Sequence, residues 1–223
     1  VSQDPYGLRR QAIGVLRILH DQNWKVSLES IIDIVIQQYG EQGHSVERSI
    51  QEKLFTFFKQ RLNFILKEMD IEPDVIESVL MNEIGILNYT INKAILLNEK
   101  RHDESFKDVQ EALSRVLNLA SSQKNEADKI QTDLFETDSE QQLYDTMNRV
   151  QANYAQAKME YNATVAFNEI ISLADAINGF FDNNMVMTDQ KEIRLNRLAL
   201  VHHIAKLIND FADLTVIQWR QHH

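Results

Sequence analysis

The side chains that could do chemistry in this sequence are cations and amides rather than a catalytic set. Arg115 lies on a helix expected over Phe106–Ala120 and points away from its apolar residues. At about 100° of rotation per residue, Asn118 lies about 60° from Arg115 around the helix. Lys107 precedes Arg115 by about two helical turns. Such side chains can bind a phosphate or the edge of a base, so these three residues are candidate RNA contacts.

Three further cations join this candidate set. Lys191 and Arg194 lie three residues apart at the start of the last expected helix, and Arg61 lies on the helix predicted over 46–69. Because Arg61 falls inside the apolar arc of its helix, a structural ion pair is the alternative for it. For the exposed cations the alternative is an ordinary solvated side chain.

Arg197 is expected to stabilise the fold, and direct RNA contact is the alternative for it. It lies within the apolar face of the last helix, beside residues such as Leu200 and Ile204. An isolated buried charge is strongly unfavourable, so Arg197 needs a carboxylate or carbonyl partner. Asp182 and Asp175, which precede this helix in the sequence, are the predicted partners.

Catalytic and metal-binding signatures are absent from the sequence. It contains no Cys, no Gly-rich phosphate loop, no HExxH and no Gly-x-Ser-x-Gly. Two dipeptides, His20-Asp21 and His102-Asp103, are similar to the metal-binding pair of all-α HD phosphohydrolases, but no His precedes His20. We therefore predict no catalytic residue, no metal and no cofactor, and keep an HD-type metallohydrolase as an alternative. The final His222-His223, native or part of a tag, is left out of the candidate sites.

Charge limits the kinds of partner that this chain can bind. The net charge is −10, and residues 71–188 carry 20 acidic side chains against 9 Lys and Arg. Non-specific nucleic-acid affinity comes mainly from neutralising phosphates, so RNA binding here requires a local basic patch. Without Cys and without a run of eighteen apolar residues, the chain is expected to be soluble, cytoplasmic and free of membrane contact.

The sequence predicts an all-α, multi-helix bundle. Six Gly and two Pro are too few for an all-β design, and apolar residues recur at helical spacing. Ser27 and Asn162 are predicted helix N-caps. Residues 121–161 are predicted to form a loop and a projecting helical arm, because Ser139 to Tyr161 is polar nearly all round.

The segment between the last two helices combines polar and apolar residues. Asp182, Asn183 and Asn184 suit a helix end, and the apolar strip Met185–Met187 follows them. Because it joins two helices, this strip is expected to be buried. Thr188 or Asp189 is the predicted cap of the next helix.

Four segments resemble the beta subunit of bacterial glycyl-tRNA synthetase. FFDNNMVMTDQKEIRLNRLAL is similar to that family's FFD-x-VMVM run, followed by its LR-x-NRLALL helix. PYGLRRQAIGVLRIL is similar to a DPF-x-LRR-x-A-x-GVLRIL segment of the same family. FFKQRLNFILKEMDIEPDVIESVL and SFKDVQEALSRVLNLAS match two further family segments. The matches follow the family order and cover nearly the whole chain.

The resemblance implies a C-terminal fragment that carries the helical anticodon-binding domain named for its Asp-Ala-Leu-Arg (DALR) motif. That tetrapeptide reads Lys191-Glu192-Ile193-Arg194 here, so only its Arg is kept. Residues 1–44 would close the preceding middle region of the subunit. Residues 45–223 would form the anticodon-binding domain, including the arm.

The function implied by the resemblance is binding of tRNA(Gly), including its anticodon. In this family the alpha subunit activates glycine with ATP and charges the tRNA, so the fragment alone is not expected to be catalytic. Its implied partners are tRNA(Gly) and the alpha subunit, in a heterotetramer of two alpha and two beta chains. A helical protein–protein interaction module is the alternative that the net acidity and the expected exposed arm from Ser139 to Tyr161 favour.

Overall fold

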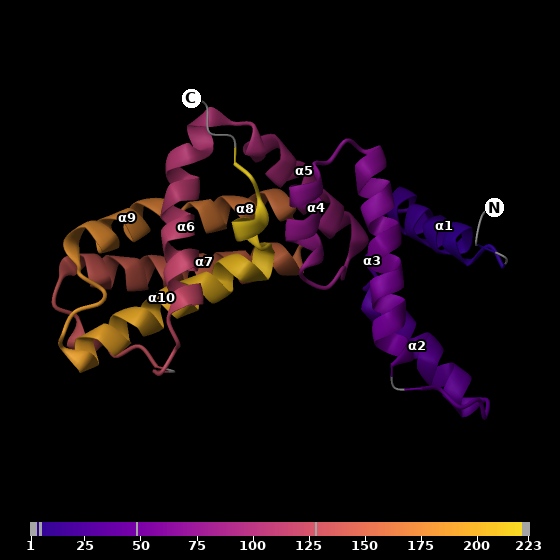
Figure 1. Cartoon of the computed structure of the whole chain (residues 1–223), viewed down its shortest axis with the longest axis horizontal. Helices are drawn as coiled ribbons and strands as arrows, with labels where there is room; N and C mark the ends of the chain where they lie inside the picture. Colours follow the sequence, from indigo (N-terminus) through magenta and orange to yellow (C-terminus); the bar gives the residue numbers. More distant parts are fainter. Residues whose placement is uncertain (1–3, 5, 48, 128, 220–223) are drawn as a thin grey trace. The chain divides into compact units, whose positions relative to one another are not determined.

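The computed structural model describes residues 4, 6–47, 49–127 and 129–219. Over these residues every named element is an α-helix or a short 3-10 helix (Figure 1), which confirms the predicted all-α class. His222 and His223 lie outside the described residues. No helix in the described ranges is both long and apolar enough to cross a membrane.

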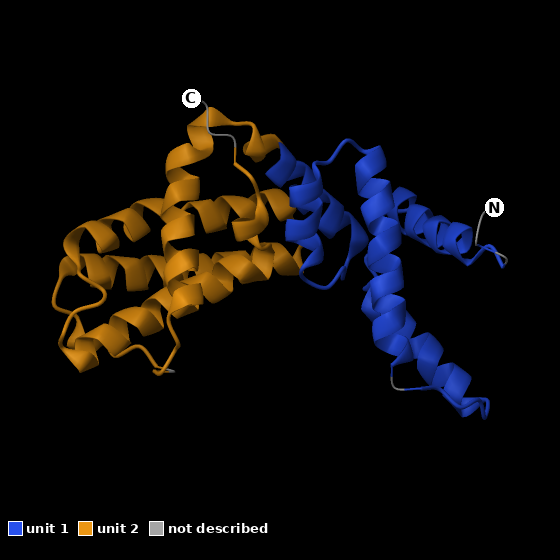
Figure 2. Cartoon of the chain, viewed as in Figure 1, with its two compact units in different colours: residues 1–98 blue, residues 99–223 orange. Residues whose placement is uncertain are grey.

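The chain divides into two compact units, Val1–Asn98 and Glu99–His223 (Figure 2). We call them unit 1 and unit 2. This division does not coincide with the boundary predicted between residues 44 and 45. That boundary concerned the domain organisation of the family, and it stays a prediction.

Unit 1 is built around α3, which packs against its neighbours α1, α2 and α4. Ser27 caps α2 as predicted, since its side chain accepts the N–H of Ser30. Within this unit the helices are α1 (Leu8–Asp21), α2 (Leu28–Glu41), α3 (Ile50–Glu68), α4 (Pro73–Leu80) and α5 (Leu87–Arg101), whose last residues belong to unit 2.

Unit 2 is a helical bundle in which α6 runs across α9 and α10 (Figure 1). Helix α7 packs against α8, α9 and α10, and Phe167, Phe180 and Phe211 are fully buried. The helices are α6 (Lys107–Ser122), α7 (Asp138–Met159), α8 (Ala163–Ile171), α9 (Ala174–Asn183) and α10 (Lys191–Phe211), and the 3-10 helices are η1 (Glu104–Phe106), η2 (Thr132–Leu134) and η3 (Leu214–Val216).

Helix α7 is not a projecting arm, so this part of the prediction for residues 121–161 is wrong. Most residues of α7 are polar, but apolar residues recur every three or four positions and bury one side of the helix. The buried residues of this strip are Leu143, Met147, Val150, Tyr154 and Ala157. Asn162 caps the following helix α8 as predicted, by accepting the N–H of Val165.

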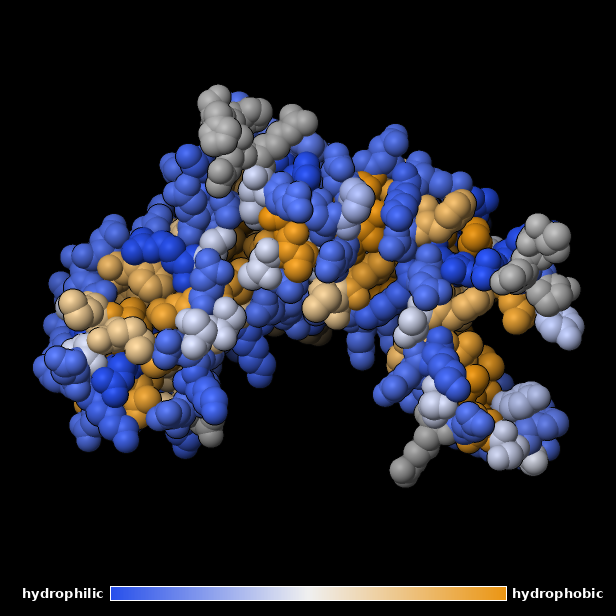
Figure 3. All heavy atoms as spheres, in the orientation of Figure 1, coloured by the Kyte–Doolittle hydropathy of each residue, from blue (hydrophilic) through white to orange (hydrophobic). Residues whose placement is uncertain are grey.

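The connection between α9 and α10 is only partly buried. Val186 is 6% exposed, but Met185 is 73% and Met187 47% exposed, so the expected burial of the whole strip is wrong. Figure 3 shows apolar side chains at the surface over this connection. The predicted cap is also wrong, because Gln190 occupies the N-cap position of α10 and makes no side-chain cap bond.

Candidate nucleic-acid interface

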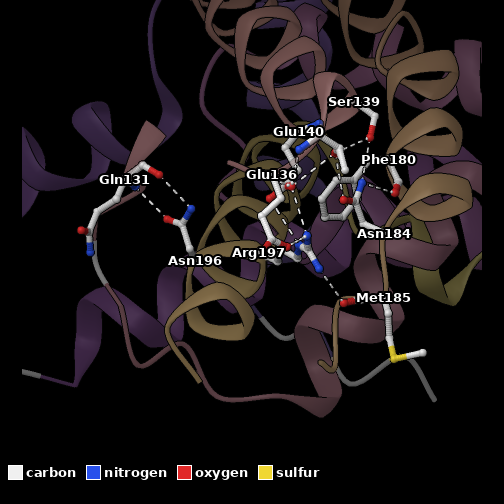
Figure 4. Close-up of polar contacts among 10 residues, drawn as sticks. Gln131, Glu136, Ser139, Glu140, Phe180, Asn184, Met185, Asn196 and Arg197 are labelled. Carbon is white, nitrogen blue, oxygen red and sulfur yellow. Dashed lines mark hydrogen bonds and ion pairs between the residues drawn. The ribbon is translucent and has the colours of Figure 1, made fainter. Parts of the chain in front are cut away.

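Arg197 of α10 is buried, with 6% of its side chain exposed, and its charge is matched on several sides (Figure 4). Its Nε and Nη2 donate to the two carboxylate oxygens of Glu140 on α7, at 3.2 Å each. Nη2 also contacts Glu136 at 2.9 Å, and Nη1 donates to the backbone carbonyl of Met185 at 3.0 Å. One side chain thus ties α10 to the start of α7 and to the segment after α9.

The prediction that Asp182 or Asp175 pairs with Arg197 is wrong, and Asp175 is exposed. Glu140 takes this place because the start of α7 already positions its carboxylate. Thr137 and Glu140 form a capping box, in which Glu140 accepts the N–H of Thr137 at 3.2 Å. A buried carboxylate still requires a cation, and Arg197 supplies it with two well-placed bonds.

Two buried asparagines fix the backbone around this ion pair (Figure 4). Asn184 donates to the hydroxyl of Ser139 and to the carbonyl of Phe180, both at 2.8 Å. Asn196 accepts the N–H of Gln131 at 2.7 Å and donates to its carbonyl at 2.9 Å. Buried amides are stable only when they are bonded in this way. We call Glu136, Glu140, Asn184, Asn196 and Arg197 the Arg197 cluster.

Arg115 of α6 reaches across to α9. Its Nη1 lies 3.4 Å from Asn178 Oδ1 and 3.5 Å from Asp182 Oδ1. Its guanidinium carbon lies 4.5 Å from the centroid of the Phe181 ring. The Arg115 side chain is 43% exposed and that of Asp182 is 68% exposed, so this ion pair is a weak surface pair. The structure therefore holds Arg115 in place and leaves it accessible.

A surface groove beside α6 gathers half of the predicted RNA contacts. Lys107, Arg115 and Asn118 all line it. Four further lining residues of types that can bind RNA were not predicted as contacts, namely Lys100, Arg101, His102 and Trp219. Lys100, Arg101 and His102 are consecutive in the sequence at the end of α5. This run of basic residues was the sequence signal that could have indicated them. We call this surface the α6 groove.

The other predicted contacts do not line the α6 groove. Arg194 is half-buried and donates to the backbone carbonyl of Thr188 at 2.7 Å, while Lys191 is exposed at the start of α10. Arg61 belongs to unit 1, where its guanidinium lies 4.9 Å from the Phe57 ring centroid. Only Lys107, Arg115 and Asn118 of the six are therefore brought together.

Lys100 and Asp103 form a close charged contact in the groove, with an Nζ–Oδ2 distance of 2.7 Å. The hydrogen bond from Lys100, followed by bonds from Ser105, lowers the pKa of Asp103 from 3.8 to about 2. Asp103 therefore stays ionised in all but very acidic solution. Its charge holds Lys100 at the edge of the groove.

A metal site of the HD type lacks support. No group of three or more His, Cys, Asp or Glu among the residues that the structure describes could hold a metal ion. His20 instead contacts the side chain of Asn88, with 2.6 Å between Nδ1 and Oδ1. Asp103 contacts Lys100 and Ser105, as described above.

Two family models match this chain. Residues 1–81 match the model described as glycyl-tRNA synthetase beta subunit, and residues 109–219 match the DALR anticodon binding domain. The chain belongs to the glycyl-tRNA synthetase beta-subunit family. Arg115, Asn118 and the whole Arg197 cluster lie within the DALR match.

Curated relatives lead to the same family. The glycine–tRNA ligase beta subunit of Oceanobacillus iheyensis is 41% identical over 221 residues, which cover 99% of this chain and 32% of the relative. The beta subunit of Bacillus subtilis is 34% identical over 218 residues, which cover 97% of this chain and 30% of the relative. That of Clostridioides difficile is 32% identical over 219 residues, which cover 98% of this chain and 31% of the relative. The chain thus spans about a third of the length of these relatives. The resemblance read from the sequence is confirmed.

Replacing Arg197 with Ala should lower the free energy of unfolding by about 3–5 kcal/mol, because Glu140 is left buried without its cation. Urea unfolding followed by circular dichroism measures this change. Arg194→Ala is the matched control on the same helix. It removes one hydrogen bond and should cost about 1 kcal/mol. Equal losses for the two variants would contradict the central role of Arg197.

Asp103 should titrate with a midpoint near pH 2, measured from its carboxyl chemical shift. Because its pKa is lowered on folding, the stabilisation from Asp103 is present above its ordinary pKa of 3.8 and is lost as the pH falls through about 2. Lys100→Ala should raise the midpoint toward 3.8, since the Lys100 bond is the main cause of the shift. An unchanged midpoint in that variant would remove Lys100 as the cause.

Proposed function

We propose that the α6 groove binds tRNA, and that this tRNA is tRNA(Gly), contacted at its anticodon arm. The observation that carries the proposal is the convergence of Lys107, Arg115 and Asn118 on one groove, next to Lys100 and Arg101. The match of residues 109–219 to the DALR anticodon binding domain supports the same ligand. Cations, an exposed amide and an aromatic ring are the side chains that RNA recognition uses.

The charge distribution favours the groove over the rest of unit 2. Residues 99–223, which make up unit 2, contain 13 Lys and Arg against 20 Asp and Glu, and four of the 13 line this groove. Three acidic residues also line it, so cations are in the local majority on a chain with a net charge of −10. The four cations are Lys100, Arg101, Lys107 and Arg115. RNA phosphates should therefore be attracted to this surface rather than to the whole unit.

The cations of the groove differ in how available they are to RNA. The Nζ of Lys107 lies 3.8 Å from Oε1 of Glu111, and both side chains are more than half exposed. An exposed pair of this kind contributes about 0–1 kcal/mol, so a phosphate can replace the carboxylate at little cost. Lys100 is held more tightly by Asp103 at 2.7 Å. Lys107 is therefore the phosphate contact that we propose first.

We propose that this binding serves ATP-dependent charging of tRNA(Gly) with glycine in the cytoplasm. The curated relatives are named as beta subunits of glycine–tRNA ligase. In this proposal the alpha subunit carries out glycine activation and transfer, in an assembly of two alpha and two beta chains. The 223-residue chain then contributes tRNA affinity and no catalytic residue or cofactor.

Filter-binding titration of the 223-residue chain with tRNA(Gly) and with a non-cognate tRNA, each at two salt concentrations, tests the proposal. We expect tighter binding of tRNA(Gly) and an affinity that falls with salt, because bound counterions are released from the RNA. Absence of binding at low salt would contradict tRNA recognition. It would leave the helical protein–protein interaction module as the better explanation of the fold.

Lys107→Glu should weaken tRNA binding about tenfold, which corresponds to roughly 1.4 kcal/mol. It should also reduce the slope of log affinity against log salt by about one, as expected for the loss of one phosphate contact. The matched control is Lys206→Glu, which makes the same charge change at an exposed position on α10 that does not line the groove. Equal effects of the two variants would place the RNA elsewhere.

A further inference from the structure

Arg115 lies between α6 and α9 in a geometry that suits stacking better than phosphate binding. Its guanidinium is placed over the Phe181 ring, at 4.5 Å from carbon to centroid. Phe181 in turn packs edge-on against Phe180, at 5.3 Å between centroids, and Phe180 is fully buried. The ring beneath the guanidinium is thus anchored in the core of unit 2.

The polar contacts of Arg115 keep the guanidinium in position without enclosing it. Both contacts use Nη1, which lies 3.4 Å from Asn178 and 3.5 Å from Asp182. The carboxylate of Asp182 already offsets part of the positive charge, so a phosphate would be attracted less strongly here than at an isolated cation. With 43% of its side chain exposed, Arg115 can be reached by a ligand in the groove.

We infer that Arg115 and Phe181 form a stacking platform for one unpaired RNA base, which would lie on the guanidinium face turned away from Phe181. A guanidinium is planar and weakly hydrated, so it stacks on aromatic rings on either face. Unpaired bases of RNA loops are commonly bound on such planes. This inference rests on the proposed binding of tRNA and assigns the chemistry of one of its contacts.

Asn118 is placed to read the edge of the same base. It is exposed, lies three residues after Arg115 on α6, and lines the same groove. Residues three apart on a helix are neighbours on its surface. An amide side chain can both donate to and accept from the edge of a base, so it adds selectivity that stacking lacks.

Arg115→Lys distinguishes stacking from phosphate binding, because Lys keeps the charge and loses the planar group. Titration with tRNA(Gly) at several salt concentrations should show that Arg115→Lys and Arg115→Ala weaken binding by a similar factor, roughly tenfold. Neither should change the salt slope. Phe181→Leu should show a smaller loss, because Arg115 then lacks its aromatic support. An Arg115→Lys variant with wild-type affinity, or an Arg115→Ala variant with a salt slope lower by about one, would overturn the inference.

A fluorescent base gives an independent measurement. 2-Aminopurine placed singly in the anticodon loop should change its emission on binding to the wild-type chain at one loop position. That change should be lost with Arg115→Lys and kept with Lys107→Glu when each variant is at saturating concentration. Urea unfolding of each variant shows whether the fold is retained. If no loop position loses its emission change in the Arg115→Lys variant, the platform is contradicted.

The two proposals fail in different ways. A wild-type chain that does not bind tRNA(Gly) at low salt would overturn both of them. A chain that binds tRNA and responds to Lys107→Glu, but whose Arg115→Lys variant keeps its affinity, would overturn the stacking platform alone. The wild-type titration is therefore the first measurement of the series.

Discussion

The buried ion pair between Arg197 and Glu140 is the interaction on which unit 2 depends. Removing both charges from water is costly, and the cost is offset only when nearly every donor and acceptor is used. Here Glu140 serves the capping box of α7 as well as Arg197, and Arg197 also bonds Glu136 and the carbonyl of Met185. The start of α7, the end of α9 and helix α10 can therefore reach this arrangement only together.

The same cluster determines what the surface presents. Because Asn184 is fixed by a buried hydrogen bond and the Met185 carbonyl by a partly buried one, the last turn of α9 is fixed as well. That turn carries Phe181 and Asp182, which contact Arg115 from α6. The buried contacts thus belong to the frame of unit 2, whereas the ion pairs of Lys107 and Arg115 in the groove are long and exposed. Weak contacts are what a binding surface requires, since a ligand has to replace them.

The sequence predicts the helices well and their partners less well. Apolar periodicity is a local property, so the all-α class and the position of Arg197 on a core face could both be read from the sequence. Its partner could not, because Glu140 lies 57 residues away and its capping box is a local motif without information on tertiary contacts. Helix α7 was misjudged for a different reason: its single apolar strip from Leu143 to Ala157 is outnumbered by polar residues. Lys107, Arg115 and Asn118 share one helix face, which is why sequence reasoning could group them. Lys100–His102 form a consecutive run in the sequence, but only the fold places this run at the same groove.

A net negative charge is compatible with RNA recognition if the groove binds only RNA that makes specific contacts there. An acidic surface repels RNA in general, which lowers the affinity for wrong positions and wrong partners. In the proposed function, the residual attraction of a few groove cations would bring an RNA loop near α6 without holding it tightly. The proposed stacking on Arg115 and hydrogen bonding to Asn118 would depend little on salt and much on an unpaired, correctly shaped base. On such a surface the specific contacts, rather than the total charge, decide which RNA stays bound.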